Sequence, residues 1–294
     1  MTPGRAAAWV RLLRPHHWTK NLACLAGVLF SGRFVETEAD VRALWTFAVF
    51  CAASSAVYAL NDVLDRERDR RHPRKRTRPI ASGAISVGTA VGIAGALAVA
   101  SLVGAGALGG GVLACLVLYV ANNVAYSVAL KHLALFDVLS IALGFVFRLL
   151  AGVYVVGELP TTWISLCAFF LALFLAFGKR RAELAGLGEQ TNDQRPVLSR
   201  YTLSYLDSLL NSSAVMAVIC YALFTTMPGK NPSLVVGVPI VFYAIMHYKR
   251  LVMLLDASEE PEQILLRDTP IRVSIALWLA TYVLIEHAGV HFFR

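Results

Sequence analysis

The sequence predicts an all-α integral membrane protein whose helices cross the bilayer about nine times. Hydrophobic residues occupy 57% of the 294 positions, and the mean hydropathy is +0.62. A soluble domain has an apolar fraction nearer ~45–50%. The excess lies in runs of about 20 mostly apolar residues, the length that a helix needs to cross the hydrocarbon core. The alternation of apolar and polar residues that is typical of porin strands is absent, so we expect helices.

We expect a single transmembrane catalytic domain that covers residues 1–294. Two polar segments interrupt the apolar pattern, at residues 61–83 and 178–205, and they hold most of the residues capable of chemistry. We interpret both segments as active-site loops. The nine expected spans lie at residues 19–35, 41–60, 84–106, 109–130, 135–156, 160–178, 206–227, 232–250 and 271–289.

The basic residues predict the orientation of these spans. Of the 27 Lys and Arg residues, 22 fall at the N-terminus or in the loops after spans two, four, six and eight, and 4 fall on the opposite side. Because basic residues are retained on the cytoplasmic side, we expect the N-terminus inside, the C-terminus outside and both polar loops in the cytoplasm. The net charge of +8 therefore indicates topology in a lipid bilayer and not nucleic-acid binding.

An acidic cluster follows the second span. Asn61, Asp62, Asp65 and Asp69 project within an arc of about 100° if the span continues as a helix. Carboxylates on one face repel one another unless a cation is bound, and oxygen ligands suit Mg²⁺, which is normally held by one or two carboxylates and by substrate phosphates. The alternative is a solvated helix end whose acids pair with neighbouring arginines.

A basic stretch from Arg74 to Arg78 comes directly after the acids. Guanidinium groups match phosphate oxygens in shape and charge, so we expect this stretch to bind the anion that accompanies the metal. The alternative is an anchor that binds lipid head groups on the cytoplasmic side.

Two further features lie at or inside the spans. Lys20 and Asn21 stand at the mouth of the first span, beside Trp18, which is expected at the level of the lipid head groups. Arg148 is the only charge well inside a span. An intramembrane arginine is costly and is by default functional. The alternatives are a lipid head-group contact or a structural ion pair with Asp137, which lies eleven residues earlier on the same helical face.

With these residues assembled, the chain resembles the UbiA superfamily of intramembrane prenyltransferases. The signature is Asn61-Asp62-x-x-Asp65-x-x-x-Asp69, with Arg78-Pro79 after it. The resemblance implies a UbiA-like helical bundle in which the aspartates bind Mg²⁺ and, through it, a diphosphate. There is one departure from the family pattern. The second acidic motif expected after span six is replaced by Gly178-Lys179-Arg180-Arg181-Ala182-Glu183.

This variant pattern is similar to one branch of the superfamily, the decaprenyl-phosphate phosphoribosyltransferases. The similarity includes Arg14-Pro15-x-x-Trp18-x-Lys20-Asn21 and extends to about residue 207. It implies a Mg²⁺-dependent pentosyltransferase of the bacterial inner membrane. Such an enzyme moves 5-phosphoribosyl from phosphoribosyl diphosphate to a polyprenyl (decaprenyl) phosphate, releases diphosphate and supplies cell-envelope arabinan synthesis. The polyprenyl chain length and self-association into a homo-oligomer are left open.

The residue roles that we expect follow from the chemistry and the resemblance together. The catalytic residues are Asp62, Asp65 and Asp69, and the metal ligands are these three with Asn61. The donor-binding residues are Lys75, Arg76, Arg78, Tyr126, Lys131, Lys179, Arg180 and Glu183. The acceptor-binding residues are Lys20, Asn21 and Arg148.

Two other functions compete with this one. A UbiA-type prenyltransferase would use a prenyl diphosphate donor, and the missing second acidic motif counts against it. A lipid-phosphate transporter or flippase would need polar residues through several spans. The chain has one deep charge and no internal repeat.

Overall fold

The computed structural model describes residues 4–293 except 35, 74, 188–195, 255–263 and 265–266. Arg74 and part of the expected 178–205 loop therefore lie outside the described residues. The described residues form helices and no strands, which confirms the all-α prediction. Eight of these helices are long and apolar enough to cross a membrane. The first expected span, 19–35, is instead a 3-10 helix followed by a nine-residue α-helix.

The chain divides into two compact units. Unit 1 comprises residues 1–128 and 147–159, and unit 2 comprises residues 129–146 and 160–294. In unit 1 the elements are α1 (Arg5–Leu13), η1 (Pro15–Leu22), α2 (Ala23–Ser31), α3 (Thr37–Leu64), α4 (Arg66–Arg71), η2 (Lys75–Thr77), α5 (Val87–Leu108) and α6 (Gly110–Val128). Helix α7 (Phe136–Tyr154) contributes its first half to unit 2 and its second half to unit 1.

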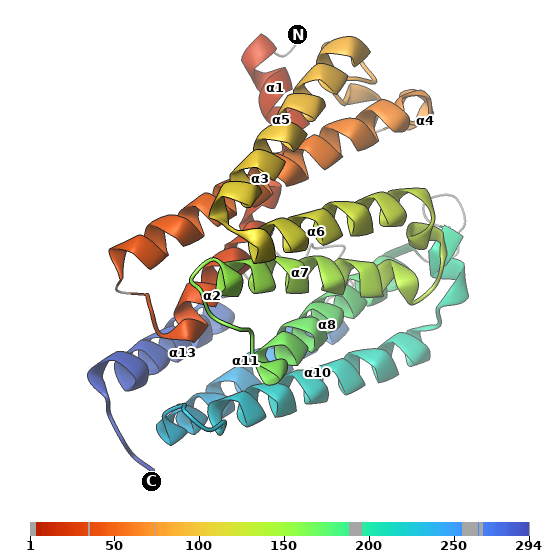
Figure 1. Cartoon of the computed structure of the whole chain (residues 1–294). Helices are drawn as coiled ribbons and strands as arrows, with labels where there is room; N and C mark the ends of the chain where they lie inside the picture. The colour runs from red at the N-terminus through yellow and green to blue at the C-terminus, as the bar shows by residue number, and fades with distance from the viewer. Residues whose placement is uncertain are drawn as a thin grey trace. The chain divides into compact units, whose positions relative to one another are not determined.

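Unit 1 is built around α3, which packs along α5 (Figure 1). Ser86 caps α5 by accepting a hydrogen bond from the Thr89 backbone N–H, as a serine at an N-cap commonly does. Gly109 turns the chain from α5 into α6 with a φ of 132°, which an L side chain rarely adopts. The core of the unit includes Phe50 of α3 and Tyr119 of α6, whose ring centroids lie 5.4 Å apart.

Two glycines let backbones meet inside unit 1. Gly27 of α2 and Gly152 of α7 lie so close that a Cβ on either one would overlap the other segment's main chain. Small residues at such crossings are the usual solution in membrane helices, because van der Waals packing replaces the hydrophobic effect there. This crossing fixes α2 against the half of α7 that carries Arg148.

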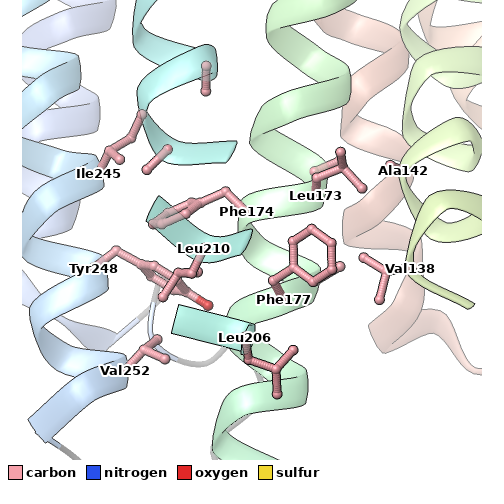
Figure 2. Packing of buried hydrophobic residues seen from close by; sticks show 14 of the residues in the cluster. Val138, Ala142, Leu173, Phe174, Phe177, Leu206, Leu210, Ile245, Tyr248 and Val252 are labelled. Atoms are coloured by element: carbon pink, nitrogen blue, oxygen red, sulfur yellow. The ribbon is translucent and has the colours of Figure 1, made fainter. Parts of the chain in front are cut away.

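In unit 2 the remaining elements are η3 (Leu130–His132), α8 (Thr162–Leu187), η5 (Pro196–Arg200), α10 (Leu203–Thr225), η6 (Pro232–Val236), α11 (Gly237–Leu254) and α13 (Thr269–Ala288). Helices α8 and α10 pack along each other. Figure 2 shows the core of this unit, where labelled side chains from α7, α8, α10 and α11 interdigitate. Phe174 and Tyr248 meet edge to face there, with ring centroids 5.2 Å apart. The N-caps of α10 and α13 are Thr202 and Asp268.

Candidate active site

The acidic cluster lies where α3 gives way to α4. Regular helix ends at Leu64, and Asp65 adopts φ −87° and ψ 2° before α4 begins. The Asp65 N–H still bonds to the Asn61 carbonyl, and the Asp69 N–H bonds to the Asp65 carbonyl. Helical spacing is thus retained through the junction, and side chains seven residues apart share a side. Asp62 and Asp69 stand in that relationship.

A pair of arginines holds these two carboxylates. Arg78 Nη1 donates to Asp62 Oδ1 at 3.1 Å and to Asp69 Oδ2 at 2.8 Å. Arg14 Nη2 donates to the same Asp62 oxygen at 2.5 Å, and its guanidinium lies 5.1 Å from the centre of the Tyr58 ring. The side chains of Asp62 and Asp69 are only 2% and 1% exposed.

Each buried carboxylate keeps one oxygen without a hydrogen-bond partner, Oδ2 of Asp62 and Oδ1 of Asp69. An unsatisfied buried carboxylate oxygen is costly, and a hard cation is the partner that such oxygens favour. Two carboxylates are also the usual protein contribution to a Mg²⁺ site that shares its ion with phosphates. This donor set therefore fits Mg²⁺.

The structure does not gather all four expected metal ligands. The Asp65 side chain is 28% exposed and pairs with Arg68 at 2.7 Å, and Asn61 is half-buried. Among the described residues, no three His, Cys, Asp or Glu side chains come together closely enough to hold a metal. Helical spacing alone does not assemble the full set, because Arg68 binds the Asp65 carboxylate instead.

The expected basic stretch lies beside the acidic cluster. Lys75 and Arg76 lie on η2, which packs against α4; Lys75 is half-buried and Arg76 is exposed. Burial, followed by the nearby Arg78 guanidinium, lowers the pKa of Lys75 below its usual value. A neighbouring cation disfavours the charged form of a lysine, and a bound anion would offset this repulsion. The segment is therefore suited to binding phosphate.

The expected acceptor residues Asn21 and Arg148 are in direct contact. Arg148 Nε donates to Asn21 Oδ1 at 2.7 Å, and Nη2 donates to the Tyr119 hydroxyl at 2.9 Å. The guanidinium also lies 4.4 Å from the centre of the Tyr119 ring. Asn21 is fully buried and Arg148 is 6% exposed, whereas the preceding Lys20 is only half-buried.

The alternative ion pair between Asp137 and Arg148 is wrong. Both residues lie on α7, and eleven residues of α-helix rise about 16 Å, which is far beyond ion-pair distance. Asp137 instead binds Arg180, whose Nε donates to Asp137 Oδ2 at 2.7 Å. Sharing a helical face does not bring two side chains into contact when three turns separate them.

Unit 2 thus contains a second charged cluster. Arg180 is 1% exposed, and its Nη1 also donates to Glu183 at 2.8 Å. The Tyr201 hydroxyl donates to Asp137 Oδ1 at 2.8 Å. Burial raises the pKa of Tyr201, which keeps its hydroxyl protonated. Lys179 is half-buried beside Arg180.

The expected donor residues are divided between the units. Unit 1 contains Lys75, Arg76, Arg78 and Tyr126, and unit 2 contains Lys131, Lys179, Arg180 and Glu183. Tyr126 is half-buried near the end of α6, and Lys131 is half-buried on η3.

Comparison with known proteins agrees with these motifs. Residues 21–266 match the UbiA prenyltransferase family. The chain belongs to this family. It is 37% identical to the decaprenyl-phosphate phosphoribosyltransferase of Mycolicibacterium smegmatis, over 92% of this chain and 90% of the relative. It is 35% identical to the protein of the same name from Mycobacterium tuberculosis, over 94% and 93% of the two chains.

The UbiA fold is also evident from a solved structure. A UbiA homolog from Archaeoglobus fulgidus, bound to DMAPP and Mg²⁺, superposes with a TM-score of 0.72 at 23% identity, over 95% of this chain and 98% of that one. The match confirms the expected UbiA-like bundle. With eight candidate spanning helices, this UbiA-family chain is a multi-pass membrane protein.

The structure places three residues in the charged clusters described above to which the sequence had assigned no role: Arg14, Tyr119 and Tyr201. Arg14 was visible within the Arg14–Asn21 motif, but its contact with Asp62 spans 48 residues. Tyr201 and Asp137 are 64 residues apart. Neither contact leaves a periodic signal in the sequence.

Proposed function

We propose that this chain transfers 5-phosphoribosyl from phosphoribosyl diphosphate to a polyprenyl phosphate, in particular decaprenyl phosphate, with release of diphosphate. The observation that carries the proposal is the end-to-end similarity to proteins named decaprenyl-phosphate phosphoribosyltransferase, at 35–37% identity over more than nine-tenths of this chain. The half-buried Lys179 supports it, because a donor with an extra 5-phosphate needs more positive charge than a prenyl diphosphate does.

Asp62 and Asp69 are the proposed principal ligands of Mg²⁺, with Asp65 and Asn61 completing the set. The ion, when bound, offsets negative charge on the diphosphate leaving group. The unpaired oxygens of Asp62 and Asp69 support this role. Asp65 can join once Arg68 releases it, since that pair lies in a partly exposed position where ion pairs are weak.

Arg14 and Arg78 hold the two carboxylates in place and supply positive charge beside them. Lys75 and Arg76 extend this charge along η2 and are proposed contacts to the donor's diphosphate. Fixed cations that are aimed at developing charge stabilise a transition state without reorganising during the reaction. Tyr126 is a proposed neutral hydrogen-bonding contact to the donor.

In unit 2, Lys131 and Lys179 are the proposed contacts to the donor's 5-phosphate. Both side chains are half-buried and cationic. A lysine ammonium binds phosphate as a compact point charge, without the bidentate geometry that an arginine imposes. Glu183 is proposed to act through Arg180, which it binds.

The acceptor is proposed to enter from the bilayer, with its tail in lipid and its phosphate near Lys20. Its phosphate oxygen is already an anion, so in-line attack on ribose C1 requires no strong general base and proceeds with inversion. Positioning of the two substrates provides most of the acceleration. Asn21 and Arg148, which bind each other, are proposed to contact the acceptor together with Lys20.

The distribution of basic residues supports an inner-membrane orientation with the N-terminus and the active-site segments in the cytoplasm and the C-terminus outside. Reactivity of single introduced cysteines toward an impermeant thiol reagent, in intact cells, tests this topology. Labelling at position 76 in intact cells would overturn it.

Mass spectrometry of lipid products tests the proposed reaction directly. Purified protein with Mg²⁺, phosphoribosyl diphosphate and decaprenyl phosphate should yield the phosphoribosyl lipid and diphosphate in equal amounts. A parallel reaction with a prenyl diphosphate and an aromatic acceptor tests the family's alternative activity. Product only in the second reaction would overturn the proposal, and release of diphosphate in neither would favour a transporter.

A further inference from the structure

We propose that Tyr201 is a positioning residue for donor binding, because its hydroxyl fixes the buried Asp137–Arg180 pair that anchors the lysine-bearing end of α8. The inference rests on the proposed function only in naming the donor. Tyr201 itself touches neither substrate in this scheme. It acts through Asp137 and Arg180.

The Tyr201 hydroxyl uses both of its hydrogen-bonding capacities. It donates to Asp137 Oδ1 at 2.8 Å and accepts from the Leu135 backbone N–H at 2.6 Å. Tyr201 is 5% exposed and Asp137 is fully buried. Buried hydrogen bonds of this kind restrict a side chain to one arrangement, because losing one leaves an unpaired polar group in a poorly solvated place.

The second carboxylate oxygen of Asp137 accepts a hydrogen bond from Arg180. Arg180 Nε donates to it at 2.7 Å, and the Arg180 side chain is 1% exposed. With Nη1 bound to Glu183, the guanidinium is engaged by two carboxylates. Such an arginine is poorly placed to bind a phosphate, so we assign Arg180 a positioning role in place of the donor contact expected from the sequence.

Leu135 shows that the hydroxyl holds the backbone as well. Its φ is 69°, a left-handed conformation that L side chains rarely adopt. The Leu135 carbonyl also accepts from the N–H groups of Val138 and Leu139, and so starts α7. The tyrosine therefore ties down the turn between η3 and α7, four residues after Lys131.

Three segments of unit 2 meet in this way: the η3–α7 turn, the end of α8 and the segment after η5. Elements η3 and η5 also pack against each other. Lys179 neighbours Arg180 in sequence, and successive residues leave a helix about 100° apart. Fixing the Arg180 guanidinium inward thus orients Lys179 to a different side. The Tyr201 hydroxyl therefore fixes the two segments that carry Lys131 and Lys179.

Tyr201→Phe isolates this hydroxyl, because the ring and its packing are retained. We expect the KM for phosphoribosyl diphosphate to rise about tenfold, the effect of roughly one buried hydrogen bond, with the KM for the lipid acceptor unchanged. Tyr205→Phe is the matched control: Tyr205 stacks on Tyr201 with ring centroids 6.4 Å apart, but it is 42% exposed. That variant should match the wild type in both constants.

Equal changes in both KM values, or a lower thermal midpoint without a donor effect, would show that Tyr201 is merely structural and overturn the inference. If Tyr201→Phe fails to fold, Arg180→Lys provides the test, since it keeps the charge but loses the guanidinium geometry; it should raise the donor KM selectively. If wild-type protein uses a prenyl diphosphate instead, the proposed function fails, and the same comparison made with that donor decides the role of Tyr201.

Discussion

Arg78 uses a single nitrogen, Nη1, to bind two carboxylates seven residues apart, Asp62 at 3.1 Å and Asp69 at 2.8 Å. One cation therefore fixes the last turn of α3 relative to α4 across the break at Asp65. It also allows two acids to be buried within two turns of each other, where their mutual repulsion would otherwise oppose folding. The site is thus arranged by a protein cation before any metal binds.

Arg78→Ala should lower the free energy of unfolding by roughly 3 kcal/mol, because it leaves Asp69 buried without its ion-pair partner. The measurement is thermal unfolding of the purified protein in detergent. Arg71→Ala removes an exposed arginine from the same segment and should change the midpoint little. Equal midpoints for the two variants would mean that Arg78 does not hold the acids.

Asp69→Asn should lower turnover by at least about 100-fold and raise the Mg²⁺ concentration needed for half-maximal rate, since it removes a ligand charge while keeping the shape. Initial rates measured across a Mg²⁺ titration provide the test. Glu67→Gln is the control, because Glu67 is 69% exposed and pairs only with neighbouring arginines. An unchanged Mg²⁺ requirement in Asp69→Asn would remove Asp69 from the metal site.

Gly152→Ala should prevent stable folding, since the new Cβ would overlap the main chain of α2 at Cys24, and backbone cannot move aside as a side chain can. The yield of monodisperse protein after detergent extraction reports this. Gly95→Ala is the control, because nothing lies within 4 Å of a Cβ placed there. Comparable yields would show that the α2–α7 crossing is looser than described.

The sequence was sufficient to predict what depends on local pattern. Apolar runs gave the spanning helices, because crossing a bilayer requires a minimum length. The seven-residue spacing of Asp62 and Asp69 placed them on one side of a helix, as found. The first span was less predictable, since its composition does not reveal that residues 15–22 adopt a 3-10 helix.

Long-range pairing could not be predicted in the same way. Asp62 near the end of α3 and three acids after it lie close in sequence to many arginines, and the sequence does not specify that Asp62 takes Arg14 while Asp65 takes Arg68. For Asp137, helical periodicity suggested Arg148 as an alternative partner, whereas tertiary packing selects Arg180. Periodicity specifies the direction in which a side chain points, but packing between elements determines which partner it meets.

Asn21 and Arg148 should be energetically coupled, because Asn21 is fully buried and accepts a hydrogen bond from the charged Arg148. A double-mutant cycle with Asn21→Ala and Arg148→Ala should give about 1–3 kcal/mol of coupling in unfolding free energy. The parallel cycle between Asp137 and Arg148 should be additive to within about 0.5 kcal/mol. The opposite pattern would contradict the contacts described for both residues.

Lys20→Ala should raise the KM for a long polyprenyl phosphate about tenfold and leave the KM for phosphoribosyl diphosphate unchanged. Lys20 is half-buried on η1 and directly precedes Asn21, which binds Arg148, so we expect its ammonium to meet a lipid phosphate at the membrane interface. An exposed charge pair is worth little, but a lysine at a membrane interface contributes about 1 kcal/mol toward an anionic head group. Initial rates with each substrate varied in turn separate the two constants.

The matched control for Lys20 is Arg11→Ala, which removes an exposed cation from α1 and should leave both constants unchanged. If both variants raise the acceptor KM equally, general attraction of anionic lipid explains the effect, and this attraction should disappear at high salt. If Lys20→Ala raises the donor KM instead, Lys20 belongs with Lys75 and Arg76 among the donor contacts. Loss of the effect with a short-chain acceptor in detergent would show that the lysine acts only on lipid held in the membrane.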